Sequence, residues 1–302
     1  MPEMPEVAGL AAYLTERLTG RTVAAVHVPG IQALKTFDPP PQALVGRIVD
    51  RVDRYGKWLD ILTRAGQDRD DDDDSDSEES TLSLVVHLAR AGWLRWQEKA
   101  PATVPRSPKS PIAVRVVLDD GSAFDLTEAG TRKRLAVHVV RRAGEVPLVA
   151  SLGPDPLSDE FTPAVLGELL GRRRAQLKGV LRDQSIIAGI GNAYSDEILH
   201  AAGMSPFAPT TSLTPEEVSD LHATMQAVLA EALAAAAGKP AAELKDAKRA
   251  GMRVHGRAGH ECPVCGDVVR EVSFADSSLQ YCATCQTGGK VLADRRMSRL
   301  LR

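Results

Sequence analysis

Hydrophobic positions in the first half of the chain follow two different periods. Within residues 5–18, Val7, Leu10, Leu14 and Leu18 recur at the spacing of one helix face. Beyond them the pattern changes to short stretches rich in β-branched residues, several of which alternate apolar and polar positions, as strands do. The pattern therefore predicts one helix and then eight strands. We expect the strands at 22–28, 47–55, 58–63, 82–88, 93–97, 112–118, 123–127 and 135–140.

Eight short strands at these spacings favour a two-sheet sandwich or a barrel. Asp119-Asp120-Gly121 supplies a hairpin turn between two of them. After a segment rich in proline and glycine, the period becomes helical. We expect helices at 162–172, 177–183, 192–202 and 215–237. The predicted fold class is α+β with several domains, beginning with an eight-stranded β-sandwich and its flanking helix.

Charge is distributed very unevenly along the chain. The net charge of the 302 residues is −3, but residues 68–79 hold nine acids and one arginine, hence −8, which leaves +5 for the rest. Such acidic runs are usually solvated and disordered. We expect a disordered hairpin loop over 65–80. A second reading is that this loop mimics nucleic acid and competes for a basic surface of the same protein.

All four cysteines form one cluster, with sixteen residues between the pairs Cys262/Cys265 and Cys282/Cys285. Two such pairs predict a zinc ribbon, in which the thiolates surround one structural Zn²⁺. Disulfides are the alternative, but the sequence shows neither a secretory signal peptide nor an apolar run long enough to cross a membrane. With four thiolates the zinc site is closed. The nearby His255 and His260 are therefore expected to be ordinary loop or surface residues.

The first residues carry candidate chemistry. Pro2 permits removal of Met1, which would expose a secondary amine beside the carboxylate of Glu3. An α-amino group titrates near neutrality, so this amine is a candidate nucleophile that forms Schiff bases with carbonyl-like carbons. An arbitrary start of the chain is the alternative.

Residues 184–194 contain a glycine-rich turn that precedes a predicted helix at Asn192. Such a turn can hold a phosphate with its backbone N–H groups, or it can simply connect two packed helices. Lys57, in Tyr55-Gly56-Lys57, begins a strand, where a lysine is usually solvated.

Together these segments resemble the formamidopyrimidine-DNA glycosylase / endonuclease VIII (Fpg/Nei) family of base-excision repair enzymes. The resemblance covers nearly the whole chain. Its segments are Met1–Val7, Tyr55–Lys57, Leu152–Leu157, Gly179–Asn192 and Tyr281–Gln286.

The resemblance implies a fold and a division of the chain. It implies a catalytic β-sandwich domain (1–142), a linker (143–157), a helical helix–two-turn–helix (H2TH) domain (158–250) and a four-cysteine zinc ribbon (251–288), with DNA bound between the sandwich and the helical domain. A basic tail (289–302) follows. The implied partner is double-stranded DNA with damaged bases or abasic sites. We expect a monomer with no membrane association, located in the cytoplasm with the nucleoid.

The resemblance also assigns roles to residues. Pro2 is implied to be the nucleophile that attacks C1′, Glu3 the general acid/base, and Glu6 a supporting carboxylate. Lys57 and Asn192 are implied to grip phosphates beside the lesion.

Three positions depart from the family pattern. Arg90 stands where relatives place an apolar residue that fills the space left by the flipped base. The basic tip around Arg132 replaces an Arg-Phe wedge, and Ser277 stands where the ribbon has an arginine. Arg90 and Arg132 are candidate DNA contacts, through stacking or phosphate binding. Arg270, Lys290, Arg295 and Arg296 are candidates to replace the missing ribbon arginine.

The implied activity is that of a bifunctional DNA glycosylase and abasic-site (AP) lyase. The stretch 245–257 is short for the lesion-covering loop of 8-oxoguanine-specific members, which favours endonuclease VIII-like substrates. The alternative function is a catalytically weak protein that binds damaged DNA on the same scaffold. The preferred lesion, the opposite base and the extent of elimination are not readable from the sequence.

Overall fold

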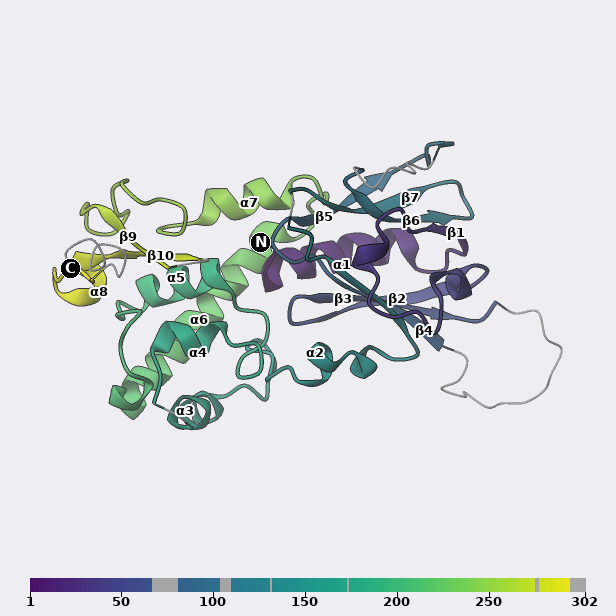
Figure 1. The fold of residues 1–302 in the computed structure, drawn as a ribbon. Coiled ribbons are helices and arrows are strands. Elements are labelled where there is room, and N and C mark those ends of the chain that lie inside the picture. Colours follow the sequence, from purple (N-terminus) through teal and green to yellow (C-terminus); the bar gives the residue numbers. More distant parts are fainter. Residues whose placement is uncertain (67–80, 104–109, 131, 173, 275–276, 294–302) are drawn as a thin grey trace, which may run out of the picture. The chain divides into compact units, whose positions relative to one another are not determined.

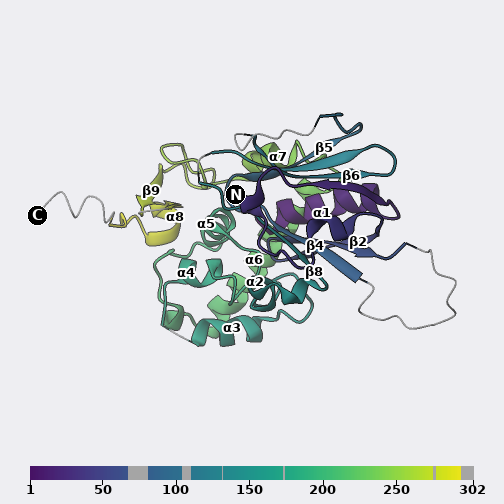
Figure 2. The ribbon, with the colours of Figure 1, turned by 45° about the vertical axis from the view of Figure 1, so that its right-hand side comes forward.

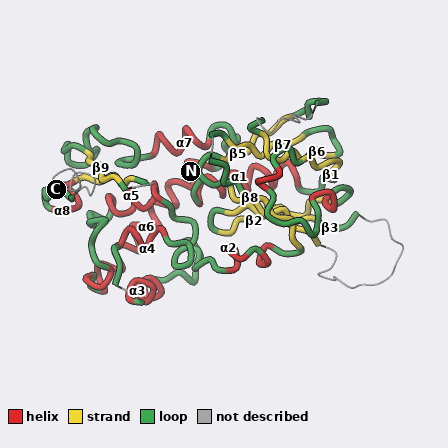
Figure 3. The backbone as a smooth tube through the Cα atoms, in the orientation of Figure 1, coloured by secondary structure: helices red, strands yellow, loops and turns green. Residues whose placement is uncertain are grey.

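A computed structural model describes residues 1–66, 81–103, 110–130, 132–172, 174–274 and 277–293 (Figure 1). The chain divides into two compact units. Unit 1 comprises residues 1–151 and 236–245, and unit 2 comprises residues 152–235 and 246–302. Strands dominate unit 1, whereas unit 2 is mainly helical (Figure 3). Most of the predicted acidic loop lies outside the described residues.

Unit 1 is a sandwich of two antiparallel four-stranded sheets, with strand orders β1-β6-β7-β5 and β2-β3-β4-β8. The eight predicted strands are confirmed to within one residue at each end. Their bounds are β1 (Val23–His27), β2 (Ile48–Tyr55), β3 (Trp58–Arg64), β4 (Thr81–His87), β5 (Gly92–Gln97), β6 (Ile112–Leu118), β7 (Ala123–Glu128) and β8 (Ala136–Val140).

Helix α1 (Met4–Leu18) packs between the two sheets (Figure 1 and Figure 2). The four apolar residues that predicted it are all completely buried, in a core shared with side chains of both sheets. Gly9 allows close packing on its other side, because a Cβ there would lie 2.9 Å from Leu244 Cδ2 and 3.2 Å from Ala236 Cβ. The segment 236–245 is thus part of the unit 1 core, and Trp93 Nε1 also donates to Ala241 O at 3.0 Å.

Short helical elements complete unit 1. Its ordered connections are the 3-10 helices η1 (Ile31–Ala33), η2 (Pro41–Leu44) and η4 (Ala143–Glu145) and the one-turn helix α2 (Pro147–Ala150). These elements are too short to show a hydrophobic period, so the sequence pattern did not predict them.

Unit 2 contains the predicted helices and, in the zinc ribbon, a two-stranded hairpin. Its elements are α3 (Pro163–Gly171), α4 (Leu177–Arg182), α5 (Asn192–Ala201), η5 (Thr210–Ser212), α6 (Pro215–Ala236), α7 (Leu244–Gly251), β9 (Val269–Ser273), β10 (Ser278–Cys282) and α8 (Ala283–Thr287). Ala236, Leu244 and Lys245, at the ends of α6 and α7, belong to unit 1. The sequence pattern did not predict α7, which has one large apolar side chain, Leu244. Among the described helices, none is both long and apolar enough to cross a bilayer.

Two buried carboxylates in unit 1 have contrasting environments. Asp125 accepts two hydrogen bonds from Arg115, at 2.7 Å from Nε and 2.8 Å from Nη2, so its charge is paired. Asp60 is 3% exposed, and its Oδ1 has no hydrogen-bond partner among the described residues. Burial, reinforced by the nearby Asp53 carboxylate, raises the pKa of Asp60 to about 6. Asp60 therefore destabilises the folded state when it is ionised.

The pKa of Asp60 predicts a pH-dependent stability. Its folded value of about 6 lies above the ordinary value of 3.8, so the folded state binds the proton more tightly. The destabilisation is absent below about pH 4, grows between about pH 4 and pH 6, and is constant above that range. Asp60→Asn should therefore raise the free energy of unfolding at pH 7.5, by on the order of 2 kcal/mol, and leave it unchanged at pH 4.

Urea unfolding followed by tryptophan fluorescence measures this effect, because all three tryptophans lie in unit 1. Asp119→Asn, on an exposed turn, is the control. Equal gains for Asp60→Asn at pH 4 and pH 7.5 would contradict the assignment.

Candidate functional site

The start of α1 holds three of the predicted site residues close together. Pro2, Glu3 and Glu6 are all buried, and the two glutamates are only 2% and 3% exposed. Glu3 is the N-cap of α1, and Pro5 lies in the first turn, where a missing N–H costs nothing. Glu3 and Glu6 form a capping box, in which Glu6 Oε2 accepts from the Glu3 N–H at 2.8 Å. The carboxylates are thereby fixed beside Pro2.

The direction of α1 follows from its two ends. Beyond its last turn, the Gly20 N–H donates to Val49 O at 2.9 Å, so α1 ends beside the beginning of β2. Figure 1 shows α1 running alongside β2 and β3. A 15-residue helix is about 22 Å long and an eight-residue strand about 26 Å. The amino end of α1 therefore lies toward the end of the sheet where β2 finishes, at Tyr55.

Lys57 lies in the turn that joins β2 to β3 at this end of the sheet. The turn has two residues, Gly56 and Lys57, between the paired residues Tyr55 and Trp58. Gly56 has φ 55°, which glycine adopts without strain. Lys57 is 7% exposed. The sequence-based expectation of a solvated lysine is therefore wrong, and its side chain is held within the protein.

The Lys57 ammonium influences a neighbouring histidine. His87, at the end of β4, pairs with Trp58, and their ring centroids are 4.7 Å apart. Burial and the positive charge of Lys57 lower the pKa of His87 to about 4. His87 is thus a neutral ring beside the lysine at physiological pH. No local pattern predicted this pair, since the two residues lie 30 positions apart and meet only through strand pairing.

Arg90 and Arg132 belong to turns at the same end of the sandwich. The turn after β4 leads into β5, whose first residue, Gly92, pairs with Glu128 at the end of β7. A Cβ on Gly92 would approach Leu88 O to 2.1 Å, so this tight turn requires glycine there. Arg90 and Arg132 are exposed.

The tip that carries Arg132 is ordered by the Glu128 carboxylate, which accepts the N–H groups of Arg134 and Leu135 at 2.7 and 3.0 Å. Together, these turns form what we call the basic end of unit 1: Lys57, Arg90, Arg132, Lys133 and Arg134. The strand ends next to the acidic segment, Arg64 and Thr81, pair with each other at the opposite end of their sheet.

In unit 2, the glycine-rich turn is supported by a side chain within it. Gln184 Oε1 accepts from the Gly189 N–H at 3.0 Å, and Gln184 Nε2 donates to Ile190 O at 2.7 Å. Gly189 has φ 89°, so the turn requires glycine at this position. Asn192 follows as the first residue of α5. Its Nδ2 donates to Ser278 O at 2.7 Å, and its Oδ1 is buried without a hydrogen-bond partner in the described structure.

Helix α5 also carries a buried polar network that the sequence pattern did not reveal. Lys178 Nζ lies 2.6 Å from Asp196 Oδ1, and the Asp196 Oδ2 atom lies 2.8 Å from His255 Nδ1. Glu197 accepts the backbone N–H groups of residues 253, 254 and 255 at 2.7–3.0 Å. His255 is thus half-buried and specifically bonded, contrary to the expectation of an ordinary loop residue. His260 is exposed, as expected.

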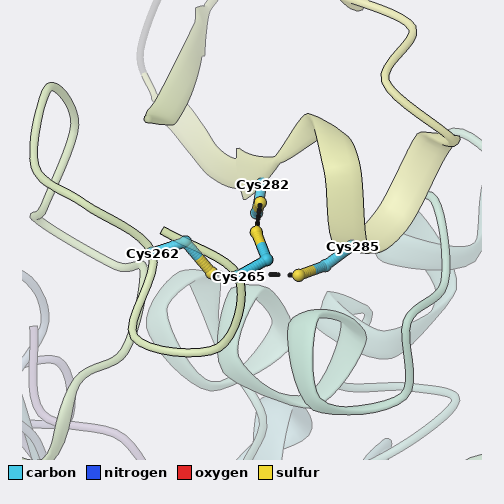
Figure 4. A group of neighbouring side chains, drawn as sticks. All are labelled: Cys262, Cys265, Cys282 and Cys285. Atoms are coloured by element: carbon cyan, nitrogen blue, oxygen red, sulfur yellow. Dashed lines mark hydrogen bonds between the residues drawn. The ribbon is translucent and has the colours of Figure 1, made fainter. Parts of the chain in front are cut away.

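The four cysteines meet as the sequence predicted (Figure 4). Their sulfur atoms all lie within 4.8 Å of one another, with Sγ–Sγ distances of 3.8 Å for Cys262–Cys285 and 3.4 Å for Cys265–Cys282. A tetrahedron with zinc–sulfur distances of about 2.3 Å has edges of about 3.8 Å. The residues therefore fit one Zn²⁺, and among the described residues these cysteines form the one group suited to a metal.

Ser277 directly precedes β10, and its carbonyl accepts the Phe274 N–H, just after β9, at 2.7 Å. Of the candidate replacements for the ribbon arginine, Arg270 lies on β9 and Lys290 follows α8. Arg295 and Arg296 lie outside the described residues.

Comparison with known proteins agrees with these features. Family models match at residues 1–145 (formamidopyrimidine-DNA glycosylase N-terminal domain), 152–242 (formamidopyrimidine-DNA glycosylase H2TH domain) and 259–288 (zinc finger found in FPG and IleRS). The zinc-finger match and the sulfur geometry together establish one structural zinc ion.

Individual relatives cover most of the chain. The formamidopyrimidine-DNA glycosylase of Chloroflexus aggregans is 35% identical over 294 residues, which span 95% of this chain and 98% of that protein. An uncharacterized formamidopyrimidine-DNA glycosylase-like protein of Mycobacterium tuberculosis is 57% identical over 156 residues, 52% of this chain and 98% of the relative. The crystal structure of MutM (Fpg) from Thermus thermophilus superposes with a TM-score of 0.75 at 28% identity, covering 96% of this chain and 100% of that one.

The sandwich, the H2TH helices and the zinc ribbon thus each match a family model, in this order along the chain. The chain belongs to the formamidopyrimidine-DNA glycosylase (Fpg/Nei) family of base-excision repair enzymes.

Proposed function

We propose that this protein is a bifunctional DNA glycosylase and AP lyase that works through a Schiff base on the Pro2 amine. The observation that carries the proposal is the buried capping box, which fixes Glu3 and Glu6 beside Pro2. A helix N-terminus needs only one capping side chain, and Ser, Thr, Asp or Asn is usual there. Two buried glutamates next to a potential secondary amine serve acid–base chemistry better than capping alone.

The proposed reaction begins after removal of Met1. The Pro2 nitrogen forms a bond to C1′, the glycosidic bond breaks, and the base leaves with a proton. The C1′–O4′ bond then breaks as O4′ takes up a proton, and the resulting open-chain iminium makes a C2′ proton acidic. Loss of that proton breaks the bond from C3′ to the 3′ phosphate, which departs and leaves the strand cut. Water then hydrolyses the iminium, which releases the unsaturated sugar aldehyde and returns the free amine.

The two carboxylates have different parts in this reaction. Glu3 is next to the nucleophile in the chain, so we assign it proton transfer to the sugar during ring opening and base departure. Glu6 holds the Glu3 backbone N–H and so positions Glu3. Both lie at the amino end of α1, where the helix dipole stabilises negative charge.

DNA binding is assigned to the basic end of unit 1 and to Asn192. The lesion must leave the duplex to reach a buried Pro2, which costs a few kcal/mol and requires firm contacts to the backbone. Lys57 is partly immobilised by its surroundings, which suits a phosphate contact. Arg90 and Arg132 are exposed on turns at the same end, where they can reach phosphates or stack in the space that a flipped base leaves.

For substrate, we favour oxidised pyrimidines and abasic sites. The stretch from Lys245 to Arg257 is largely occupied by α7, which ends at Gly251. The residues after α7 are tied to Glu197 through their backbone N–H groups. Little chain is left to form a loop that closes over a flipped purine.

A second candidate function is DNA binding with little catalysis. It is favoured by Arg90 and Ser277, which replace residues that relatives use at the lesion. Proton transfer by Glu3 separates the two candidates, because binding alone does not need it.

Glu3→Gln should slow excision of an oxidised pyrimidine by about 100-fold or more, because amide and carboxylic acid differ in proton donation. Cleavage of a preformed abasic site should fall by less than about tenfold, since the base is already gone. Single-turnover kinetics on defined duplexes measure both rates. Glu16→Gln, at the exposed end of α1, is the control. Equal losses of both activities would show that Glu3 acts structurally.

The same assay on the unmodified sequence tests the substrate preference. Duplexes with dihydrothymine should be processed faster than duplexes with 8-oxoguanine. Faster removal of 8-oxoguanine would overturn the preference and leave the lyase proposal intact.

Lys57→Met should weaken binding to abasic-site DNA and reduce the slope of log K against log salt concentration by about 1, as expected for one lost phosphate contact. Lys99→Met is the matched control. Lys99 is exposed and follows the last residue of β5, whereas the first residue of β5 lies at the basic end. An unchanged slope for Lys57→Met would remove Lys57 from the DNA interface.

A further inference from the structure

A histidine on α5 touches the zinc site without belonging to it. His200 lies in the last turn of α5 and is 3% exposed. Its Nε2 is 3.2 Å from the sulfur of Cys262, which is itself 3% exposed. Within the described part of the chain, the metal-binding group consists of the four cysteines. His200 therefore contacts a ligand of the metal and not the metal.

The chemistry of the two partners fixes the direction of this hydrogen bond. A zinc-bound cysteine is a thiolate, which has no proton to donate. The Nε2 atom must then carry the hydrogen and donate it to the sulfur. The other ring nitrogen, Nδ1, is buried and has no hydrogen-bond partner among the described residues. A neutral ring protonated at Nε2 is consistent with the Cys262 contact and with the absence of a described partner at Nδ1.

Four thiolates around one Zn²⁺ leave a net negative charge, and hydrogen-bond donors to the sulfur atoms reduce its cost in a buried site. The chain supplies such a donor from 62 residues away. Residues that hydrogen-bond to metal ligands orient those ligands and strengthen metal binding, typically by about 10–100-fold.

Two further hydrogen bonds join α5 and the residues just after it to the ribbon. Asn192 Nδ2 donates to Ser278 O at the amino end of the helix. Gln286 Nε2 donates to Met204 O at 2.9 Å, just beyond its carboxyl end. Unlike these two contacts, the hydrogen bond from His200 reaches a zinc ligand directly. Loss of the metal would thus disturb the Cys262 contact at the carboxyl end of the helix whose first residue is Asn192.

We propose that His200 is a positioning residue for the zinc site, donating its Nε2–H to the Cys262 thiolate and so securing both the metal and the seat of the ribbon on α5. The inference rests on the zinc site and is independent of the proposed catalytic mechanism. The competing explanation is that His200 merely fills space.

Substitutions at position 200 separate the two explanations. His200→Phe keeps a planar ring and removes the donor, whereas His200→Gln keeps an N–H near the position of Nε2. In the zinc-loaded full-length protein, His200→Phe should release zinc to a chromogenic chelator at least about tenfold faster than the unmodified protein. His200→Gln should restore most of the retention. His260→Phe, at an exposed histidine two residues before Cys262, should release zinc at the unmodified rate.

Two spectroscopic measurements test the bond itself. In the cobalt-substituted protein, the sulfur-to-cobalt charge-transfer band should shift in His200→Phe and not in His260→Phe. In the unmodified zinc protein, which needs no variant to fold, long-range ¹H–¹⁵N spectra should show the His200 proton on Nε2. Unchanged zinc release with an unchanged cobalt spectrum, or a proton on Nδ1, would overturn the proposal.

Discussion

The burial of α1 between the two sheets is the constraint on which the proposed chemistry depends. A helix whose apolar face is completely buried cannot shift along its axis without disturbing both sheets. The residues just after its carboxyl end hydrogen-bond to β2, and Gly9 allows it to pack closely against residues 236–245. The amino end is therefore fixed in space, and Pro2, Glu3 and Glu6 are fixed with it. Rigid elements position reacting groups more accurately than loops do.

Helix α5 has the corresponding role in unit 2. It carries Asn192 as its first residue, Asp196, whose buried carboxylate pairs with Lys178 of α4, and His200 in its last turn. Through these groups it is joined both to α4 and to the zinc ribbon. In both units, a residue proposed to act on DNA is thus the first or the neighbouring residue of a well-anchored helix, where backbone N–H groups remain available for capping or anion binding.

Most of the fold was predictable because its elements are periodic. The eight strands and the long helices each contain enough apolar positions to define a period, whereas α2 and α7 do not. The cysteine cluster was predictable because it consists of two pairs of residues that are close in sequence. The chemistry of the Pro2–Glu3 pair stays a prediction of the same kind, since it concerns neighbouring residues. The hydrogen bond between His200 and Cys262, and the electrostatic influence of Lys57 on His87, join segments that are distant in sequence. No local pattern announces them, and the burial of Lys57 in particular runs against the usual behaviour of a turn lysine.

The identity of the nucleophile is the central claim, and borohydride trapping tests it most directly. The protein with Met1 removed would be incubated with an abasic-site duplex and sodium borohydride, and the cross-linked peptide identified by mass spectrometry. The account predicts a reduced adduct on the Pro2 nitrogen, absent from a form that retains Met1. An adduct on a lysine, or equal trapping with Met1 in place, would contradict it.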